Sequence, residues 1–160
     1  MRVTVAAVGR LKEGPERALL ARYQERLAPL AKRLGLAPVV WLETGESRAG
    51  DAARRREEEG AALLKLVRGA DFIVALDARG KALGSEAFAQ LLAAKRDGGT
   101  QAAGLLIGGP DGLSDGVRGA AHLQLSLGAM TLPHGLARIV LAEQLYRAAT
   151  ILSGHPYHRS

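Results

Sequence analysis

Residues 105–113 read Leu-Leu-Ile-Gly-Gly-Pro-Asp-Gly-Leu, an apolar run that ends in a glycine pair. The pattern predicts a short strand over 105–107 and a turn at its carboxyl end. Glycines at that place let a flat ligand such as a nucleoside approach the backbone closely, although a tight turn with nothing bound has the same pattern. The spacing G-G-x-x-G departs from the dinucleotide fingerprint G-x-G-x-x-G, so a Rossmann-type site is not supported.

On both sides of this stretch, short apolar runs typical of strands alternate with segments whose apolar residues have helical spacing. Strands are predicted at 3–8, 38–42, 72–76 and 122–127, and helices at about 15–34, 51–67, 85–95 and 135–152. Ser85 is the expected N-cap of the third helix, and Gly154 and Pro156 should end the last one. The alternation predicts an α/β fold with a mostly parallel sheet covered on both faces, and ligands at the carboxyl ends of the strands. With 160 residues and no linker, we expect one domain, 1–160.

The charged run 54–59 lies inside the second predicted helix. Its i,i+4 pairs, Arg54 with Glu58 and Arg55 with Glu59, suit a helix face that is exposed to solvent.

Composition excludes several classes of protein. Hydrophobic residues make up 48% and charged residues 24%, which is typical of a chain with a packed core. The absence of cysteine excludes disulfides, thiolate zinc sites, iron–sulfur clusters and cysteine nucleophiles. No apolar run is long enough to cross a bilayer and no signal-peptide pattern is present, so we expect a cytoplasmic protein without membrane contact.

A net charge of +6 and a pI near 10.2 favour a polyanionic partner such as nucleic acid. The positive excess lies in residues 1–40 and 117–160.

Common catalytic motifs are absent. The span from Gly9 to Gly14 has phosphate-loop spacing, but Pro15 stands where the lysine is needed. No G-x-S-x-G elbow occurs. All four histidines lie in the last 40 residues without a metal-binding spacing, so no metal site is expected.

The last third of the chain carries unusual polar residues. His134 stands before the last helix, and Glu143 and Arg147 are spaced for an i,i+4 pair. The tail 155–159, His-Pro-Tyr-His-Arg, has too few apolar side chains to dock by burial and would ordinarily fray. It makes sense if it closes over a polar ligand or an RNA strand.

Four motifs, in order, resemble the RlmH family, whose members are SPOUT-class methyltransferases that act on a pseudouridine of bacterial 23S rRNA. They are 105–113, 126–134 (Ser-Leu-Gly-Ala-Met-Thr-Leu-Pro-His), 142–148 (Ala-Glu-Gln-Leu-Tyr-Arg-Ala) and 155–159. The match spans nearly the whole chain.

The resemblance implies a parallel-sheet SPOUT fold with a C-terminal trefoil knot, which binds S-adenosylmethionine. By motif, the cofactor residues would be Leu76, Gly109, Gly128, Ala129, Met130, Thr131, Leu132 and Pro133. It also implies a homodimer in which one subunit's tail completes the other's site. The implied product is N3-methylpseudouridine, made in 23S rRNA of the assembled ribosome.

The N3 imide proton of the substrate must leave during this reaction, so a base should help. His134 and Glu143 are the candidates, and His134 could equally be positional, as a helix cap. We assign Tyr157 to packing against a base and Arg159 to a phosphate or a developing negative oxygen, with Arg138 as a weaker phosphate candidate. Two alternatives stay open: another SPOUT enzyme that modifies tRNA, and a ribosome-binding factor without catalysis.

Overall fold

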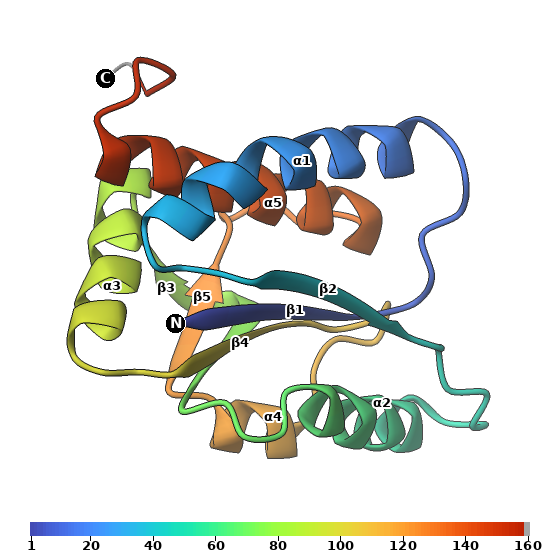
Figure 1. Ribbon diagram of the computed structural model, residues 1–160. Coiled ribbons are helices and arrows are strands. Elements are labelled where there is room, and N and C mark those ends of the chain that lie inside the picture. Colours follow the sequence, from blue (N-terminus) through green and yellow to red (C-terminus); the bar gives the residue numbers. More distant parts are fainter. Residues whose placement is uncertain (159–160) are drawn as a thin grey trace.

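A five-stranded parallel sheet with the order β2-β1-β4-β3-β5 forms the centre of the computed structural model, which describes residues 1–158 (Figure 1). The strands are β1 (Arg2–Val8), β2 (Val39–Thr44), β3 (Phe72–Ala82), β4 (Ala102–Ile107) and β5 (Leu123–Ser126). The helices are α1 (Pro15–Arg33), α2 (Ala52–Leu66), α3 (Ser85–Asp97), α4 (Asp115–Ala120) and α5 (His134–Ser153). The predicted parallel α/β sheet is confirmed.

Helices cover both faces of the sheet. α1, α3 and α5 lie on one face, and α2 and α4 lie on the other (Figure 1). Alternate residues of β1 serve the two layers: Val3 and Val5 belong to the core under α1, α3 and α5, whereas Ala6 and Val8 belong to the core over α2 and α4. All six residues of β4 are buried, which is typical of a central strand in a parallel sheet.

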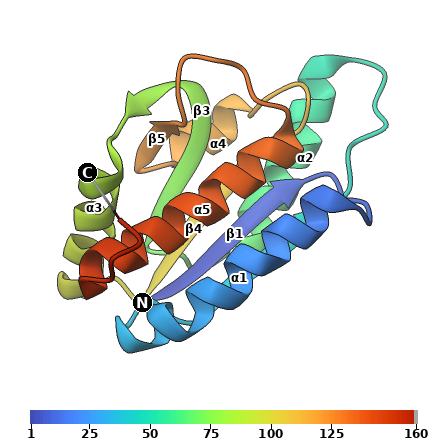
Figure 2. The same ribbon diagram turned by 90° about the horizontal axis from the view of Figure 1, so that it is seen from above.

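Helix α5 lies between α1 and α3 and is buried along most of its length (Figure 2). It runs opposite to the strands, so its first residues stand at the carboxyl edge of the sheet. None of the helices within residues 1–158 combines the length and the apolar character needed to cross a membrane.

Two features of the fold escaped the sequence patterns. Helix α4 is only six residues long and contains two glycines, so it has no helical periodicity to detect; Ser114 caps it by accepting a hydrogen bond of 3.2 Å from the Val117 N–H. Strand β3 continues to Ala82 through a bulge, because Leu125 of β5 pairs with both Leu76 and Lys81.

Two helix-end predictions had different outcomes. The expected N-cap Ser85 is wrong: Gly84 is the cap, and the Ser85 hydroxyl donates instead to Gln144 Oε1 at 2.7 Å. The expected end of α5 at Gly154 is confirmed, since Gly154 takes the left-handed conformation with φ 67°.

The prediction that the run 54–59 forms two i,i+4 pairs on an exposed helix face is correct for one pair and wrong for the other. Arg54 and Glu58 form the expected pair at 3.1 Å on the surface. Arg55 does not pair with Glu59 but with Asp111, at 2.7 Å, and Glu59 is only 3% exposed. Long-range contacts with the loops at the sheet edge replace the local helix pair.

Candidate functional site

A cavity of about 600 Å³ opens at the carboxyl edge of the sheet, beside the ends of β3, β4 and β5. Most of its wall is formed by residues 76–78, 107–110, 112–113, 127–128 and 130–134. The place agrees with the rule that open parallel sheets bind ligands outside the carboxyl ends of their strands.

The cavity brings together most of the residues expected to bind the cofactor. Those that line it are Leu76, Gly109, Gly128, Met130, Thr131, Leu132 and Pro133. Ala129 belongs to the same loop but is not part of the lining. Segments that are more than fifty residues apart in the sequence therefore meet at one cavity.

The cavity's size and lining fit S-adenosylmethionine. Its volume lies within the range of about 300–1,000 Å³ that small-ligand sites occupy. Two glycines of the wall, Gly112 with φ 83° and Gly128 with φ 138°, have open space where a Cβ would stand, so the backbone is bare toward a ligand. Leu76, Leu125 and Leu127 supply an apolar surface for a flat base.

A charged pair also lines the cavity. Arg118 of α4 donates to Asp77 Oδ2 at 2.7 Å, and the Asp77 side chain is 7% exposed. Burial raises the pKa of Asp77, but hydrogen bonds from the Arg79 N–H and from Arg118 outweigh it and lower that pKa overall. Sequence reasoning missed this pair, although a polar residue directly after the buried run 72–76 was a signal for it.

His134 is the first residue of α5 and lines the cavity. It is not the helix cap, because Pro133 occupies that position without a side-chain cap. Its Nε2 lies 3.5 Å from the point where a Cβ of Gly9 would stand, and Glu46 Oε1 lies 3.2 Å from the same point. The imidazole and the Glu46 carboxylate therefore both lie next to Gly9, beside the cavity.

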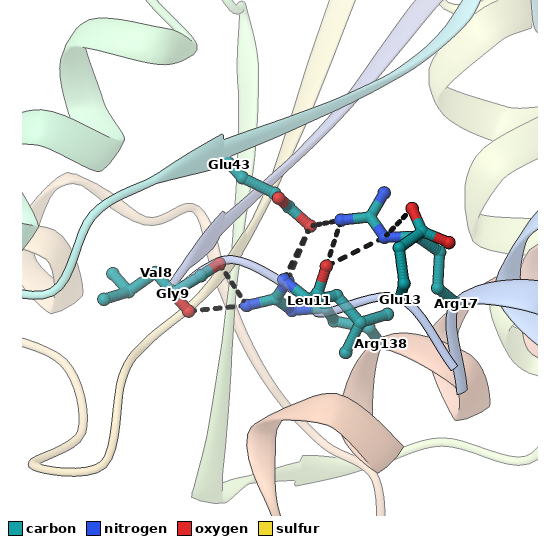
Figure 3. A network of polar contacts seen from close by, with 7 residues as sticks. All are labelled: Val8, Gly9, Leu11, Glu13, Arg17, Glu43 and Arg138. Atoms are coloured by element: carbon teal, nitrogen blue, oxygen red, sulfur yellow. Dashed lines mark hydrogen bonds and ion pairs between the residues drawn. The ribbon is translucent and has the colours of Figure 1, made fainter. Parts of the chain in front are cut away.

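Arg138 follows His134 by one helical turn and is not available to a phosphate. It is 1% exposed, and its Nη2 donates to the backbone oxygens of Val8 and Gly9 at 2.6 Å each, while Nη1 donates to Glu43 at 2.9 Å (Figure 3). Its assignment as a phosphate contact is therefore wrong: the side chain is buried, and both Nη atoms are bonded inside the protein.

A second arginine joins this network. Arg17 of α1 donates to the Leu11 carbonyl and lies 3.5 Å from Glu43, which also accepts the Leu11 N–H at 3.2 Å (Figure 3). The network joins α1, β1, β2 and α5 next to the cavity and holds the first turn of α5 in place.

Glu143 and Tyr157 lie outside the cavity. Glu143 pairs with Arg147 at 2.6 Å, as the spacing predicted, and accepts a hydrogen bond of 3.2 Å from the Tyr157 hydroxyl. The Tyr157 ring packs on Tyr146 with centroids 4.7 Å apart and lies under the Arg147 guanidinium. The expectation that the tail has too little apolar weight to dock is wrong, because Tyr157 anchors it to its own helix. Arg159 lies outside the described residues.

One known protein family matches this sequence over all the residues that the structure describes. The profile of the family described as "Predicted SPOUT methyltransferase" matches residues 1–158. The chain belongs to the SPOUT methyltransferase family. SPOUT relatives that match it end to end carry the name "Ribosomal RNA large subunit methyltransferase H", which confirms the resemblance drawn from the four motifs.

Two of these SPOUT relatives illustrate the match. The protein from Xanthobacter autotrophicus is 52% identical over 160 residues and covers 100% of both chains. The one from Rhizobium etli is 54% identical over 159 residues and covers 99% of both.

A solved structure shares the SPOUT fold at much lower identity. It is a probable methylase family protein from Haemophilus influenzae, with a TM-score of 0.55 and 13% identity, over 99% of this chain and 70% of that one.

No group of three or more metal-binding side chains occurs within residues 1–158 of this SPOUT chain. What the cavity offers is a bare backbone, apolar walls, one buried ion pair and an imidazole at its edge. These groups can orient a cofactor and a nucleobase, and the imidazole can accept a proton.

Proposed function

We propose that this chain transfers a methyl group from S-adenosylmethionine to N3 of a pseudouridine in 23S rRNA of the assembled ribosome. The observation that carries the proposal is the end-to-end match, at 52–54% identity, to proteins named large subunit rRNA methyltransferases. The cavity at the carboxyl edge supports it with a lining suited to the cofactor.

The cofactor's share is an electrophilic methyl group on a sulfonium. This chain's share is to hold that group and to align the uracil ring with it. Leu76, Gly109 and the loop 128–133 are proposed to hold the cofactor, mainly through backbone groups, since the glycines of the wall present no side chain to it.

His134 is proposed as the acceptor of the N3 proton. Its imidazole lines the cavity, and a ring nitrogen of an imidazole can accept a proton as a general base. The Glu46 carboxylate lies next to Gly9, as this imidazole does.

A homodimer is proposed to complete the site. His134 and Glu143 are nine residues apart on α5, which separates them by about 13 Å along the helix axis at 1.5 Å per residue. Glu143, Tyr157 and Arg159 would therefore serve the cavity of a second copy rather than their own, with Tyr157 packed against a base and Arg159 on a phosphate.

We also propose that the C-terminal segment is threaded as a trefoil knot within one domain, 1–160. The convergence of the β3 bulge, the turn 108–112 and the loop 127–133 on one cavity supports this arrangement. A ribosomal substrate supports a cytoplasmic location, and the net charge of +6 suits an rRNA partner.

Methyl transfer from labelled S-adenosylmethionine to unmodified ribosomes, free 23S rRNA and tRNA, assayed in parallel, tests the proposal. Label in the large ribosomal subunit alone is the expected result. Label in tRNA would instead show that the chain is a SPOUT enzyme that methylates tRNA. Cofactor binding without any transfer would indicate a factor that lacks catalysis.

A further inference from the structure

We propose that Arg55 and Glu59 of α2 are positioning residues that hold the turn 108–112 against the loop 45–51 and thereby keep the cofactor cavity in its binding shape. The two residues are one helical turn apart and reach two different loops at the same edge of the sheet. The effect on cofactor affinity rests on the proposed function, whereas the effect on the turn itself does not.

Arg55 makes the more extensive of the two connections. Its Nε and Nη2 donate to the two carboxylate oxygens of Asp111 at 2.7 and 3.2 Å, and its Nη1 donates to the Ala49 carbonyl at 3.0 Å. A forked contact of this kind fixes orientation as well as distance. Asp111 lies between Gly109 and Gly112, which both line the cavity, so Arg55 controls the turn without touching a ligand.

Glu59 supports the same two segments from beneath. Its Oε1 accepts the Ser47 N–H at 2.9 Å, whereas its Oε2 is buried and has no hydrogen-bond partner among the described residues. That oxygen lies 3.0 Å from the point where a Cβ of Gly109 would stand. A buried carboxylate oxygen without a partner is costly and calls for an explanation. The position of this oxygen behind Gly109 supplies that explanation, because it blocks movement of the turn 108–112 away from the cavity.

The loop 45–51 extends this connection to the proposed base. Ser47 and Ala49 bind α2, while Glu46 of the same loop stands beside Gly9 and His134. One helix face therefore positions both the cofactor turn and the carboxylate that lies near the imidazole. Neither connection is local in sequence, because Arg55 and Asp111 are 56 positions apart.

The affinity of the whole protein for S-adenosylmethionine tests the proposal, measured by calorimetry on Arg55→Ala, Asp111→Asn and the double variant. Each single variant should raise Kd about tenfold, and the double variant should be no worse than Arg55→Ala, because the loss of Arg55 already removes the contact with Asp111. In turnover, KM for the cofactor should rise while KM for ribosomes and kcat stay near the wild-type values. Arg54→Ala is the matched control: it breaks the exposed pair with Glu58 on the same helix and should leave Kd unchanged.

Hydrogen exchange on the ligand-free protein provides a test that needs no cofactor. Amides of 108–113 should exchange faster in Arg55→Ala and in Glu59→Ala than in the wild type, and as slowly as the wild type in Arg54→Ala. Unchanged exchange in both α2 variants would overturn the positioning role, whatever the protein binds. Faster exchange with unchanged cofactor affinity would overturn the link to the cavity. Failure of the wild type itself to bind the cofactor would refute the proposed function and leave the exchange result to decide on the positioning role.

Discussion

Arg138 of α5 and Glu43 of β2 form an ion pair of 2.9 Å, with the arginine buried and the glutamate half-buried, that joins positions 95 residues apart. The Arg138 side chain is 2% exposed and also binds two backbone oxygens at the end of β1 (Figure 3). Since His134 lies one turn earlier on the same helix, this pair fixes where the imidazole enters the cavity. Burial is the largest cause that lowers the pKa of Arg138, and the attraction of Glu43 opposes this lowering only in part.

Arg138→Met should destabilise the fold strongly. The change removes the donor of the Val8 and Gly9 oxygens and one of the donors of Glu43, which keeps the Leu11 N–H. Breaking a buried pair on one side costs about 3–5 kcal/mol, and the lower end is expected here because the Glu43 side chain is 28% exposed. Urea unfolding monitored by circular dichroism measures the loss. Arg22→Met on the exposed surface of α1 is the control and should change stability by less than about 0.5 kcal/mol. Equal stability of the two variants would show that the pair contributes nothing.

Gly109→Ala should weaken cofactor binding by about tenfold or more. An added Cβ would meet Val8 Cγ1 at 2.9 Å and Glu59 Oε2 at 3.0 Å, so the turn would have to shift into the cavity. Thermal shift with and without S-adenosylmethionine reports the affinity. Gly119→Ala in α4 meets nothing within 4 Å and should bind as the wild type does. A wild-type shift in Gly109→Ala would remove Gly109 from the cofactor site.

Tyr157 should titrate apart from an ordinary tyrosine. Burial first, and then its interactions with Tyr23 and Glu143, raise the pKa of Tyr157 to about 12, against about 10 in an unfolded chain. Since the folded protein holds this proton more tightly, tail docking is fully favoured below pH 10 and is lost as the pH rises through 12. Absorbance titration of the wild type and of Tyr157→Phe should show one phenol ionising near pH 12 only in the wild type. If the phenol that is missing in Tyr157→Phe instead ionises near pH 10 in the wild type, the docked tail would be contradicted.

Two inactive variants should restore activity when mixed if the site is shared between subunits. His134→Gln removes the proposed base and should lower kcat by about a hundredfold or more, with cofactor binding kept. Truncation after Ser153 removes Tyr157 and should abolish methylation while the domain stays folded.

After subunit exchange, half of the dimers pair one chain of each kind, and each of these has one complete site. The mixture should therefore recover about a quarter of the wild-type rate. No recovery would mean that each tail serves its own cavity.

Local patterns in the sequence were sufficient to predict the strands and the position of the cavity. The apolar run 105–107 with its glycine pair predicted β4 and the ligand-facing turn, because both depend on neighbouring residues. The motif 128–134 likewise led to the loop that lines the cavity, through its resemblance to a known family.

Contacts between distant segments were beyond these patterns. Arg138 was a candidate to bind a phosphate, and Glu59 was expected to pair with Arg55, yet both are buried by partners from other elements. The Asp77–Arg118 pair joins residues 41 positions apart for the same reason. A charged residue in a helix gives no periodic signal of whether it faces solvent or a distant carboxylate, so only the folded chain reveals these roles.

The central claim is tested most directly by mapping the modified nucleotide on ribosomes treated with the protein and S-adenosylmethionine. An N3 methyl group blocks base pairing, so reverse transcription of 23S rRNA should stop at one new position, and this position should be a pseudouridine. The stop should disappear when the cofactor is omitted or when the ribosomes lack that pseudouridine. A stop at an ordinary uridine, or no stop in 23S rRNA despite methyl transfer, would contradict the account.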